Sequence, residues 1–237
     1  MNIFHEDRLD TTAPYLLKLW TPGLQDSFAK INSYDLKGST MMDSAGSDGW
    51  LGGVVSDPDN YYLVDIDEEA LDKFKGKNKL LSSVEELPFE DEKFDLIVSV
   101  SSLQYINHNK YLEECHRILK PSGYLCLHEN GAYNPFINMT RVWRLILSLY
   151  DSEWKEYKNT VQKYLIKDTL TKRDDYEIVY EKNYFLLSSI SWMVEWMGFK
   201  KAGRLLEKVL LPVDNILMKI LGLNKLGFLN IYHLKKI

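Results

Sequence analysis

The chain of 237 residues has only two cysteines, Cys115 and Cys126, and no apolar run near the ~18 residues that a membrane helix needs. Two cysteines are too few for a disulfide framework and fit no metal spacing, so we expect buried thiols in a reducing compartment. The opening residues, Met-Asn-Ile-Phe-His-Glu-Asp-Arg, have neither a basic start nor an apolar segment, so no secretory signal is expected. These absences predict a cytoplasmic protein without stable membrane insertion.

An excess of positive charge is also missing. The chain has 29 basic and 34 acidic residues, a net charge of −5. Domains that bind a nucleic-acid backbone are usually basic, so no nucleic-acid partner is expected. None of the five histidines pairs with another ligand at zinc spacing, and no Ser/His/Asp or Cys/His set is recognisable. The sequence therefore predicts neither a metal site nor a nucleophilic enzyme.

From Ser39 onward, short apolar runs bounded by Gly, Pro, Asp and Ser alternate with longer amphipathic runs, which is the pattern of βα units. Strands are expected at 39–43, 61–65, 79–82, 94–100, 123–128 and 229–235, and helices at 49–56, 67–75 and 109–119. The strands lack polar alternation, which favours a parallel sheet covered on both faces. The pattern weakens after Asn130, where 137–170, 186–197 and 204–221 are expected to be helical, the last broken at Pro212, and 167–182 to form a polar loop.

The segment Asp43-Ser-Ala-Gly-Ser-Asp-Gly49 follows the first expected strand, and its small residues allow a ligand to approach the backbone. Asp65 ends the second strand at about the offset where a carboxylate meets ribose hydroxyls. Residues 38–72 contain no Lys or Arg but nine acids, which opposes a pyrophosphate. A ligand with a ribose and positive charge fits better, and S-adenosylmethionine has both. The alternative is a strand-to-helix turn without a ligand.

Five segments in order carry a family resemblance: Met41–Gly49, Tyr62–Asp67, Val84–Phe89, Lys93–Ser99 and Leu119–Tyr124. They resemble the motifs of class I S-adenosylmethionine-dependent methyltransferases, in the small-molecule, ubiquinone/menaquinone-biosynthesis-like (type 11) subgroup. The resemblance implies an α/β, Rossmann-like fold with a seven-stranded mixed sheet, helices on both faces and a helical insertion. It also implies methyl transfer to an oxygen or nitrogen atom of a small molecule, such as a sugar or an aromatic metabolite. The competing expectation is a scaffold or binding protein of this fold that has lost catalysis.

The resemblance divides the chain into four segments. They are an N-terminal helical cap (1–36), a cofactor-binding core (37–130), a helical, aromatic substrate cap (131–197), and C-terminal helices with the last strand (198–237).

The resemblance further implies that residues after the first, second, third and fourth strands hold the cofactor. The predicted cofactor-binding residues are Asp43, Ala45, Gly46, Ser47, Gly49, Asp65, Ile66, Ser83, Val84, Ser99, Gln104 and Tyr105. In the family, the position of Asp43 orients the methionine ammonium, and that of Asp65 accepts the ribose hydroxyls. Family members usually have Gly where this chain has Ala45 and Ser47, and often Asp where it has Ser83. Side chains at the first two positions would crowd the cofactor, or the loop is shifted around Gly46.

Two regions are candidates for the acceptor side of the reaction. His128 and Glu129 end the fifth expected strand, where His128 would accept a proton from the acceptor and Glu129 would orient its ring; a structural histidine is the alternative. Residues 204–228 are strongly apolar and carry four bases against two acids. This stretch packs on the sheet, forms a homodimer contact, or touches a membrane surface transiently.

Overall fold

The computed structural model describes residues 2–14, 17, 20–36, 38–150, 167–196, 198–220 and 222–237. The chain forms two compact units. The first, here the sheet unit, comprises Met1–His128, Lys167–Glu181 and Ile231–Ile237. The second, here the helical unit, comprises Glu129–Ile166 and Lys182–Asn230.

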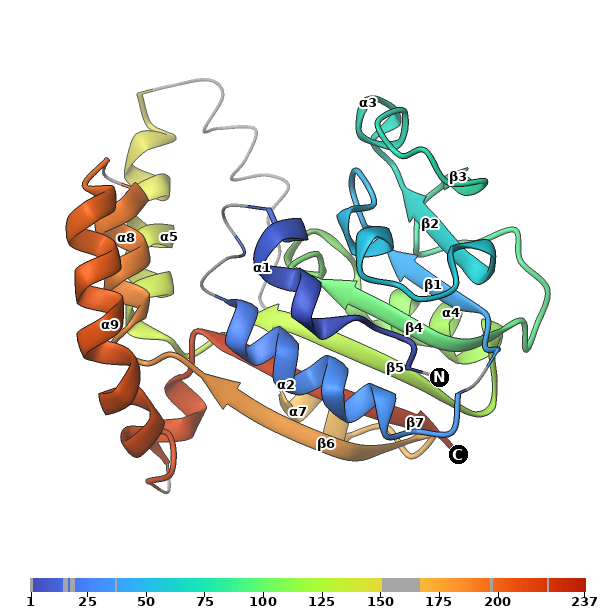
Figure 1. Cartoon of the computed structure of the whole chain (residues 1–237). Helices are drawn as coiled ribbons and strands as arrows, with labels where there is room; N and C mark the ends of the chain where they lie inside the picture. Colours follow the sequence, from blue (N-terminus) through green and yellow to red (C-terminus); the bar gives the residue numbers. More distant parts are fainter. Residues whose placement is uncertain are drawn as a thin grey trace. The chain divides into compact units, whose positions relative to one another are not determined.

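Seven strands form one sheet in the order β3-β2-β1-β4-β5-β7-β6. The strands are β1 (Met41–Ser44), β2 (Tyr61–Asp65), β3 (Asn78–Leu81), β4 (Phe94–Val100), β5 (Leu119–Asn130), β6 (Tyr176–Tyr184) and β7 (Leu229–Lys236). The first five are parallel, and Figure 1 draws β7 running against β5. This confirms the predicted seven-stranded mixed sheet.

Helices connect and follow these strands (Figure 1). They are α1 (Leu9–Thr12), α2 (Thr21–Asn32), α3 (Glu68–Leu71), α4 (His108–Ile118), α5 (Pro135–Leu147), α7 (Lys167–Thr171), α8 (Ser189–Trp196) and α9 (Lys200–Leu217). In α4, Tyr111, Leu112, Cys115 and Ile118 form the buried face, as their helical spacing predicts. The Asn107 side chain accepts a hydrogen bond from the Lys110 N–H and so caps the first turn of α4.

The central strands β1 and β4 are largely buried, although β1 contains Asp43 and Ser44. All four residues of β1 are buried, and five of the seven residues of β4 are buried. In the register, Ser44 at the end of β1 lies between Val64 of β2 and Ser99 of β4. The loops that follow these three strands therefore all begin at the carboxyl ends of the strands, which is the side where open α/β sheets bind ligands.

Four predictions of local structure differ from the structure. Residues 49–56 contain only a short 3-10 turn, Trp50–Gly53, and 67–75 contain only the four-residue α3. The expected loop 167–182 instead contains α7 and most of β6. Because β6 is the last strand of the sheet and exposes polar side chains, its sequence lacks the apolar run that marks the central strands. The expected helix 137–170 reaches only to Leu147 within the described residues, and 151–166 lie outside them.

The predicted break at Pro212 was also wrong, because α9 continues through that residue. Asp214, two residues later, is buried in the helical unit. Its carboxylate accepts hydrogen bonds from the backbone N–H groups of Leu187 (2.7 Å) and Ser188 (2.8 Å) and from the Ser188 hydroxyl. These charge-assisted bonds hold α9 to the start of α8 and offset the one backbone hydrogen bond that proline removes.

No helix among the described residues combines the length and apolar character needed to cross a bilayer. The two cysteines, Cys115 and Cys126, are buried free thiols, as predicted. Within the described part of the chain, no cluster of His, Cys, Asp and Glu side chains is arranged to hold a metal ion.

Candidate cofactor site

The loop after β1 has three residues in the left-handed backbone conformation within a stretch of five. Ala45 has φ 54°, Ser47 has φ 53° and Gly49 has φ 72°. The first two are the positions where the related family usually has glycine, the residue that adopts this conformation without steric cost. The loop thus keeps the backbone that glycines would favour, at a cost of about 1 kcal/mol for each of the two side chains.

Asp65 connects this loop to the end of β2. One carboxylate oxygen accepts a hydrogen bond from the Ser47 N–H (2.7 Å), and the other accepts one from the Asp67 N–H (2.9 Å). Asp67 in turn caps α3 by accepting a hydrogen bond from the Ala70 N–H (3.1 Å). The predicted ribose-binding carboxylate is therefore held in place by two backbone groups, and it fixes the distance between the two loops.

Asp43 lies beneath the loop and is only 2% exposed. Its carboxyl group accepts a hydrogen bond from the Tyr61 hydroxyl and lies against the Cα atom of Gly46. Burial raises the pKa of Asp43 to about 7; the hydrogen bond from Tyr61 opposes the shift, and the charge of Asp65 adds to it. A cation brought next to Asp43 would favour its ionised form, so this site favours positively charged ligands.

The acids around this loop are not all alike. Asp59 forms an ion pair with Lys77 (2.7 Å), and Asp72 forms one with Lys79 (3.1 Å). Both lysines lie beyond residue 72, so the window 38–72 still contains no basic side chain. The acids around Asp43 and Asp65 therefore still oppose the binding of a pyrophosphate, although Asp59 and Asp72, which form ion pairs, oppose it less.

The other predicted cofactor residues fall into two groups. Ser99 ends β4 fully buried, with its hydroxyl 2.6 Å from that of Ser102, and Gln104 is also buried. By contrast, Ile66 is 75% exposed and Tyr105 is 47% exposed, so their side chains have the freedom to cover a ligand. The structure thus joins Ser47 to Asp65 by a hydrogen bond and places Gly46 beside the Asp43 carboxyl group. The Tyr105 N–H donates to the Ser102 carbonyl group (3.0 Å), next to Ser99.

Ser83 and Val84 begin the loop that the family uses for the adenine edge. Ser83 is exposed, and its hydroxyl accepts a hydrogen bond from the Glu85 N–H (3.2 Å), whereas the Val84 side chain is buried. Val84 can therefore offer only its backbone to a ligand. The hydroxyl of Ser83 replaces the carboxylate common in the family and is a weaker acceptor for an amino group.

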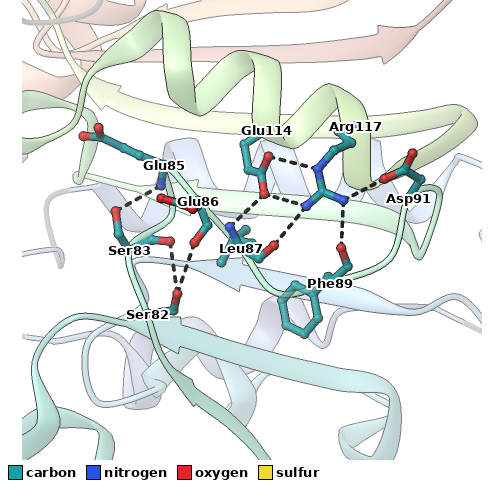
Figure 2. A network of polar contacts seen from close by, with 9 residues as sticks. All are labelled: Ser82, Ser83, Glu85, Glu86, Leu87, Phe89, Asp91, Glu114 and Arg117. Atoms are coloured by element: carbon teal, nitrogen blue, oxygen red, sulfur yellow. Dashed lines mark hydrogen bonds and ion pairs between the residues drawn. The ribbon is translucent and has the colours of Figure 1, made fainter.

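A clamp from α4 holds this loop, and Figure 2 shows it. The Arg117 guanidinium binds the Glu114 carboxylate through two hydrogen bonds (2.6 and 3.0 Å) and also donates to the backbone carbonyls of Leu87 (3.0 Å) and Phe89 (2.7 Å). Glu114 accepts a further hydrogen bond from the Leu87 N–H (2.7 Å). Arg117 also pairs with Asp91 (2.7 Å). These contacts position the loop that begins at Ser83.

Sequence reasoning missed this clamp. The spacing of Glu114 and Arg117 on one helix was visible as an i,i+3 pair. Such a pair usually stabilises only its own helix. The contacts of Arg117 with carbonyl groups some 30 residues away cannot be recognised from any pattern in the sequence.

Replacing Arg117 with alanine is expected to lower the free energy of unfolding by about 2 kcal/mol, because it removes several charge-assisted hydrogen bonds. Arg117→Lys should recover only part of this loss, since an ammonium cannot match the planar fork. Urea unfolding measures both. The control is Lys77→Met, which breaks an ion pair whose side chains are both more than 70% exposed and should change stability by less than about 0.5 kcal/mol. Equal losses for Arg117→Ala and Lys77→Met would contradict the role of the clamp.

His128 has no access to an acceptor in this structure, which corrects its expected role as a general base. The side chain is fully buried, and burial lowers its pKa to about 4. Its Nε2 lies 2.7 Å from the Ser27 hydroxyl and its Nδ1 lies 3.2 Å from the Ser99 carbonyl oxygen. Both ring nitrogens are thus used within the protein.

The hydrogen bonds continue beyond His128 in a chain that we call the histidine wire. Ser27 Oγ lies 2.7 Å from His233 Nε2, and the Tyr34 hydroxyl lies 2.8 Å from His233 Nδ1. A carbonyl only accepts, so His128 Nδ1–H donates to Ser99, and because burial keeps the ring neutral, His128 Nε2 accepts from Ser27. The Ser27 oxygen then accepts from His233 Nε2–H, and His233 Nδ1 accepts from Tyr34. Two neutral histidines therefore satisfy every donor and acceptor of the wire, in agreement with their lowered pKa values.

Glu129 does not orient the His128 ring in the predicted way. The two are consecutive residues of β5, and consecutive side chains of a strand point to opposite faces of a sheet. Glu129 is buried as well. The pair predicted to be catalytic is therefore split between two sides of the strand, and His128 has a packing role.

The residues around the β1 loop fit S-adenosylmethionine by the chemistry of their groups. Asp43 and Asp65 are acceptors suited to an ammonium and to ribose hydroxyls, and Ile66 offers an exposed apolar surface. At Gly46, which is buried, any side chain would collide with the Asp43 carboxyl group.

Comparison with known proteins supports this fit. A family model described as "Methyltransferase domain" matches residues 46–127. The human 2-methoxy-6-polyprenyl-1,4-benzoquinol methylase, mitochondrial, is 33% identical over 91 residues, which are 35% of this chain and 28% of that protein. The rice 2-methyl-6-phytyl-1,4-hydroquinone methyltransferase 2, chloroplastic (Oryza sativa subsp. japonica), is 27% identical over 164 residues, 65% of this chain and 46% of that protein. The chain thus spans less than half the length of either curated relative.

The fold is shared with a solved structure as well. The S-adenosylmethionine-dependent methyltransferase from Mesorhizobium loti has a TM-score of 0.59 at 13% identity, over 95% of this chain and 100% of that one. Residues 46–127 are thus similar to methyltransferase domains, and the chain shares its fold with a solved S-adenosylmethionine-dependent methyltransferase.

Proposed function

We propose that this protein transfers a methyl group from S-adenosylmethionine to a small-molecule acceptor. The observation that carries the proposal is the arrangement at Asp65. Asp65 ends β2 and is 9% exposed, and the hydrogen bond that its carboxylate accepts from the Ser47 N–H holds it at the left-handed β1 loop. The segment 38–72 around it lacks basic side chains. An acidic loop repels phosphate groups and attracts cations, and a fixed carboxylate can accept hydrogen bonds from a ribose. The two together suit a cationic nucleoside.

Each residue of the site has one task in this proposal. Asp43 lies under the loop and favours the positive charge of the methionine part, and Asp65 accepts hydrogen bonds from the ribose. Ile66 covers one face of the adenine, and the backbone of Val84 meets its edge. When bound, S-adenosylmethionine supplies a methyl group on a positively charged sulfur. The protein then has chiefly to align the acceptor with that methyl group and to exclude water.

The acceptor is proposed to be an aromatic small molecule rather than a sugar, methylated on oxygen or nitrogen as the sequence predicts. The support is that both curated relatives carry the name of an aromatic diol substrate, a benzoquinol and a hydroquinone. Because an acidic aromatic hydroxyl needs little help to lose its proton, the burial of His128 does not oppose this acceptor.

The proposal is tested by thermal unfolding with S-adenosylhomocysteine, the product form of the cofactor. At a concentration 100 times its dissociation constant, binding should add about 2.7 kcal/mol to stability and raise the melting temperature by roughly 5–10 °C. Asp65→Ala should abolish the shift, because it removes the acceptor for the ribose and releases the Ser47 N–H. Asp72→Ala, which removes an exposed acid paired with Lys79, should leave the shift unchanged.

Calorimetric titration distinguishes the competing function of a scaffold that has lost its cofactor. That function predicts a folded chain with no heat on adding S-adenosylhomocysteine. A dinucleotide that binds instead would point to an oxidoreductase. Either result would contradict the proposed methyl transfer.

A further inference from the structure

The exposed side of α9 carries apolar residues where a surface helix normally carries polar ones. They recur at intervals of four, four and three residues and so lie on one side of the helix. We call them the apolar stripe: Leu205, Val209, Val213 and Ile216, continued by Ile220 in the turn that follows. Leu205 and Ile216 are each 66% exposed. The stripe is separate from the side of α9 that packs on α8, which includes the buried Gly203 and Asp214.

A line of cations borders the stripe. We call Lys201, Arg204, Lys208 and Lys219 the cation row. Arg204 and Lys208 directly precede Leu205 and Val209 in sequence. Consecutive residues are about 100° apart around a helix axis, so the cation row runs along one side of the apolar stripe. All four cations are exposed. The two acids of this region point elsewhere, because Asp214 is buried and Glu207 is half-buried, where burial raises its pKa.

The charge of this region is opposite to that of the chain. Residues 199–228 carry six basic and two acidic side chains, a net charge of +4, whereas the whole chain has −5. A second copy of the protein would bring a face of the same positive charge against the first. An anionic surface with an apolar interior beneath it is complementary to both features at once.

We propose that α9 docks the protein onto a lipid bilayer with anionic headgroups. The helix lies in the plane of the interface, with the apolar stripe in the acyl boundary and the cation row among the headgroups. With 18 residues, α9 is about 27 Å long, enough for a stable interfacial contact without crossing the bilayer. In the same unit, Trp143 and Tyr150 are exposed aromatics of the type that prefers the headgroup region. The docking is independent of the methyl transfer proposed above.

The test measures co-sedimentation of the full chain, without cofactor, with vesicles of phosphatidylglycerol and phosphatidylcholine in equal parts. The chain should bind these vesicles and bind pure phosphatidylcholine far more weakly, and salt should weaken the binding. Leu205→Asp/Ile216→Asp should lower the partition coefficient roughly tenfold or more, because it places charge in the apolar stripe. Lys201→Gln/Arg204→Gln/Lys208→Gln should remove the preference for anionic lipid.

The control is Ile237→Asp, the same change at an exposed aliphatic residue of the sheet unit, which should bind like the natural chain. Circular dichroism verifies that each variant is folded. Failure of the natural chain to sediment with anionic vesicles would overturn the proposal. So would a dimer of the natural chain that Leu205→Asp/Ile216→Asp converts to a monomer, because the stripe would then be a contact between copies.

Discussion

Between about pH 6 and about pH 5, the free energy of unfolding of the ligand-free chain is expected to fall by about 1.4 kcal/mol. The cause is the histidine wire. Burial lowers the pKa of His128 to about 4 and that of His233 to about 2, whereas an unfolded histidine has a pKa of 6.5. His128 and Lys30 add to the shift at His233. Below pH 6.5 the unfolded chain therefore binds two protons that the folded chain excludes.

Asp43 acts with the opposite sign. Its pKa is about 7 when folded against 3.8 in the unfolded chain, so between these values the folded state binds one proton more. The stability that Asp43 contributes is present in acid and is lost as the pH rises through 7. For these three groups, with the unfolded histidines protonated, two protons favouring the unfolded state and one favouring the folded state leave a difference of one. One proton corresponds to a slope of about 1.4 kcal/mol per pH unit, with stability falling as the pH falls.

Variants separate these contributions. His233→Gln removes one titrating histidine and should make the profile nearly flat between pH 6 and pH 5. Asp43→Asn removes the opposing carboxyl group and should double the slope to about 2.7 kcal/mol per pH unit. Tyr34→Phe is the control, because it deletes the hydrogen bond to His233 Nδ1 without removing a group that titrates there. It should lower stability by about 1 kcal/mol at every pH. Urea unfolding as a function of pH gives all four slopes, and a flat profile for the natural chain would rule out neutral histidines in the wire.

The histidine wire also shows why the role of His128 was mispredicted. Its place at the end of β5 followed from the apolar run before it, and that placement is correct. Its partner Ser27 is 101 residues away, and His233 lies 206 residues from Ser27. No pattern in one sequence indicates such contacts, so a buried histidine and one facing a ligand look alike.

By contrast, the β1 loop could be predicted well because its determinants are local. Small residues after an apolar strand, and Asp65 at the end of the next one, are both visible within a short window. What the sequence did not show is that Ala45 and Ser47 accept a left-handed backbone. Strain in the backbone is tolerated where contacts from other parts of the chain hold it in place. At Ser47 this contact is the hydrogen bond from its N–H to Asp65.

Gly46→Ala is expected to destabilise the protein by about 3 kcal/mol and to abolish cofactor binding. The reason is contact rather than backbone conformation, since Gly46 is not among the residues with positive φ. A Cβ atom there would lie less than 3.0 Å from three atoms of the Asp43 carboxyl group, which is buried and held by Tyr61. A side chain so confined cannot yield without losing its hydrogen bond, and overpacking of this kind costs about 1–3 kcal/mol or more.

The matched control is Gly38→Ala, because Gly38 has φ 69° and no atom within 4 Å of the added Cβ. It should cost about 1 kcal/mol from backbone strain alone. If the collision with Asp43 is the cause, Asp43→Ala should suppress the effect, so that Asp43→Ala/Gly46→Ala is no less stable than Asp43→Ala. Urea unfolding measures these differences, and S-adenosylhomocysteine titration of Gly46→Ala measures the loss of binding. A cost for Gly46→Ala no greater than for Gly38→Ala would mean that Asp43 can move aside. The loop would then not be held in its cofactor-binding shape by the carboxyl group beneath it.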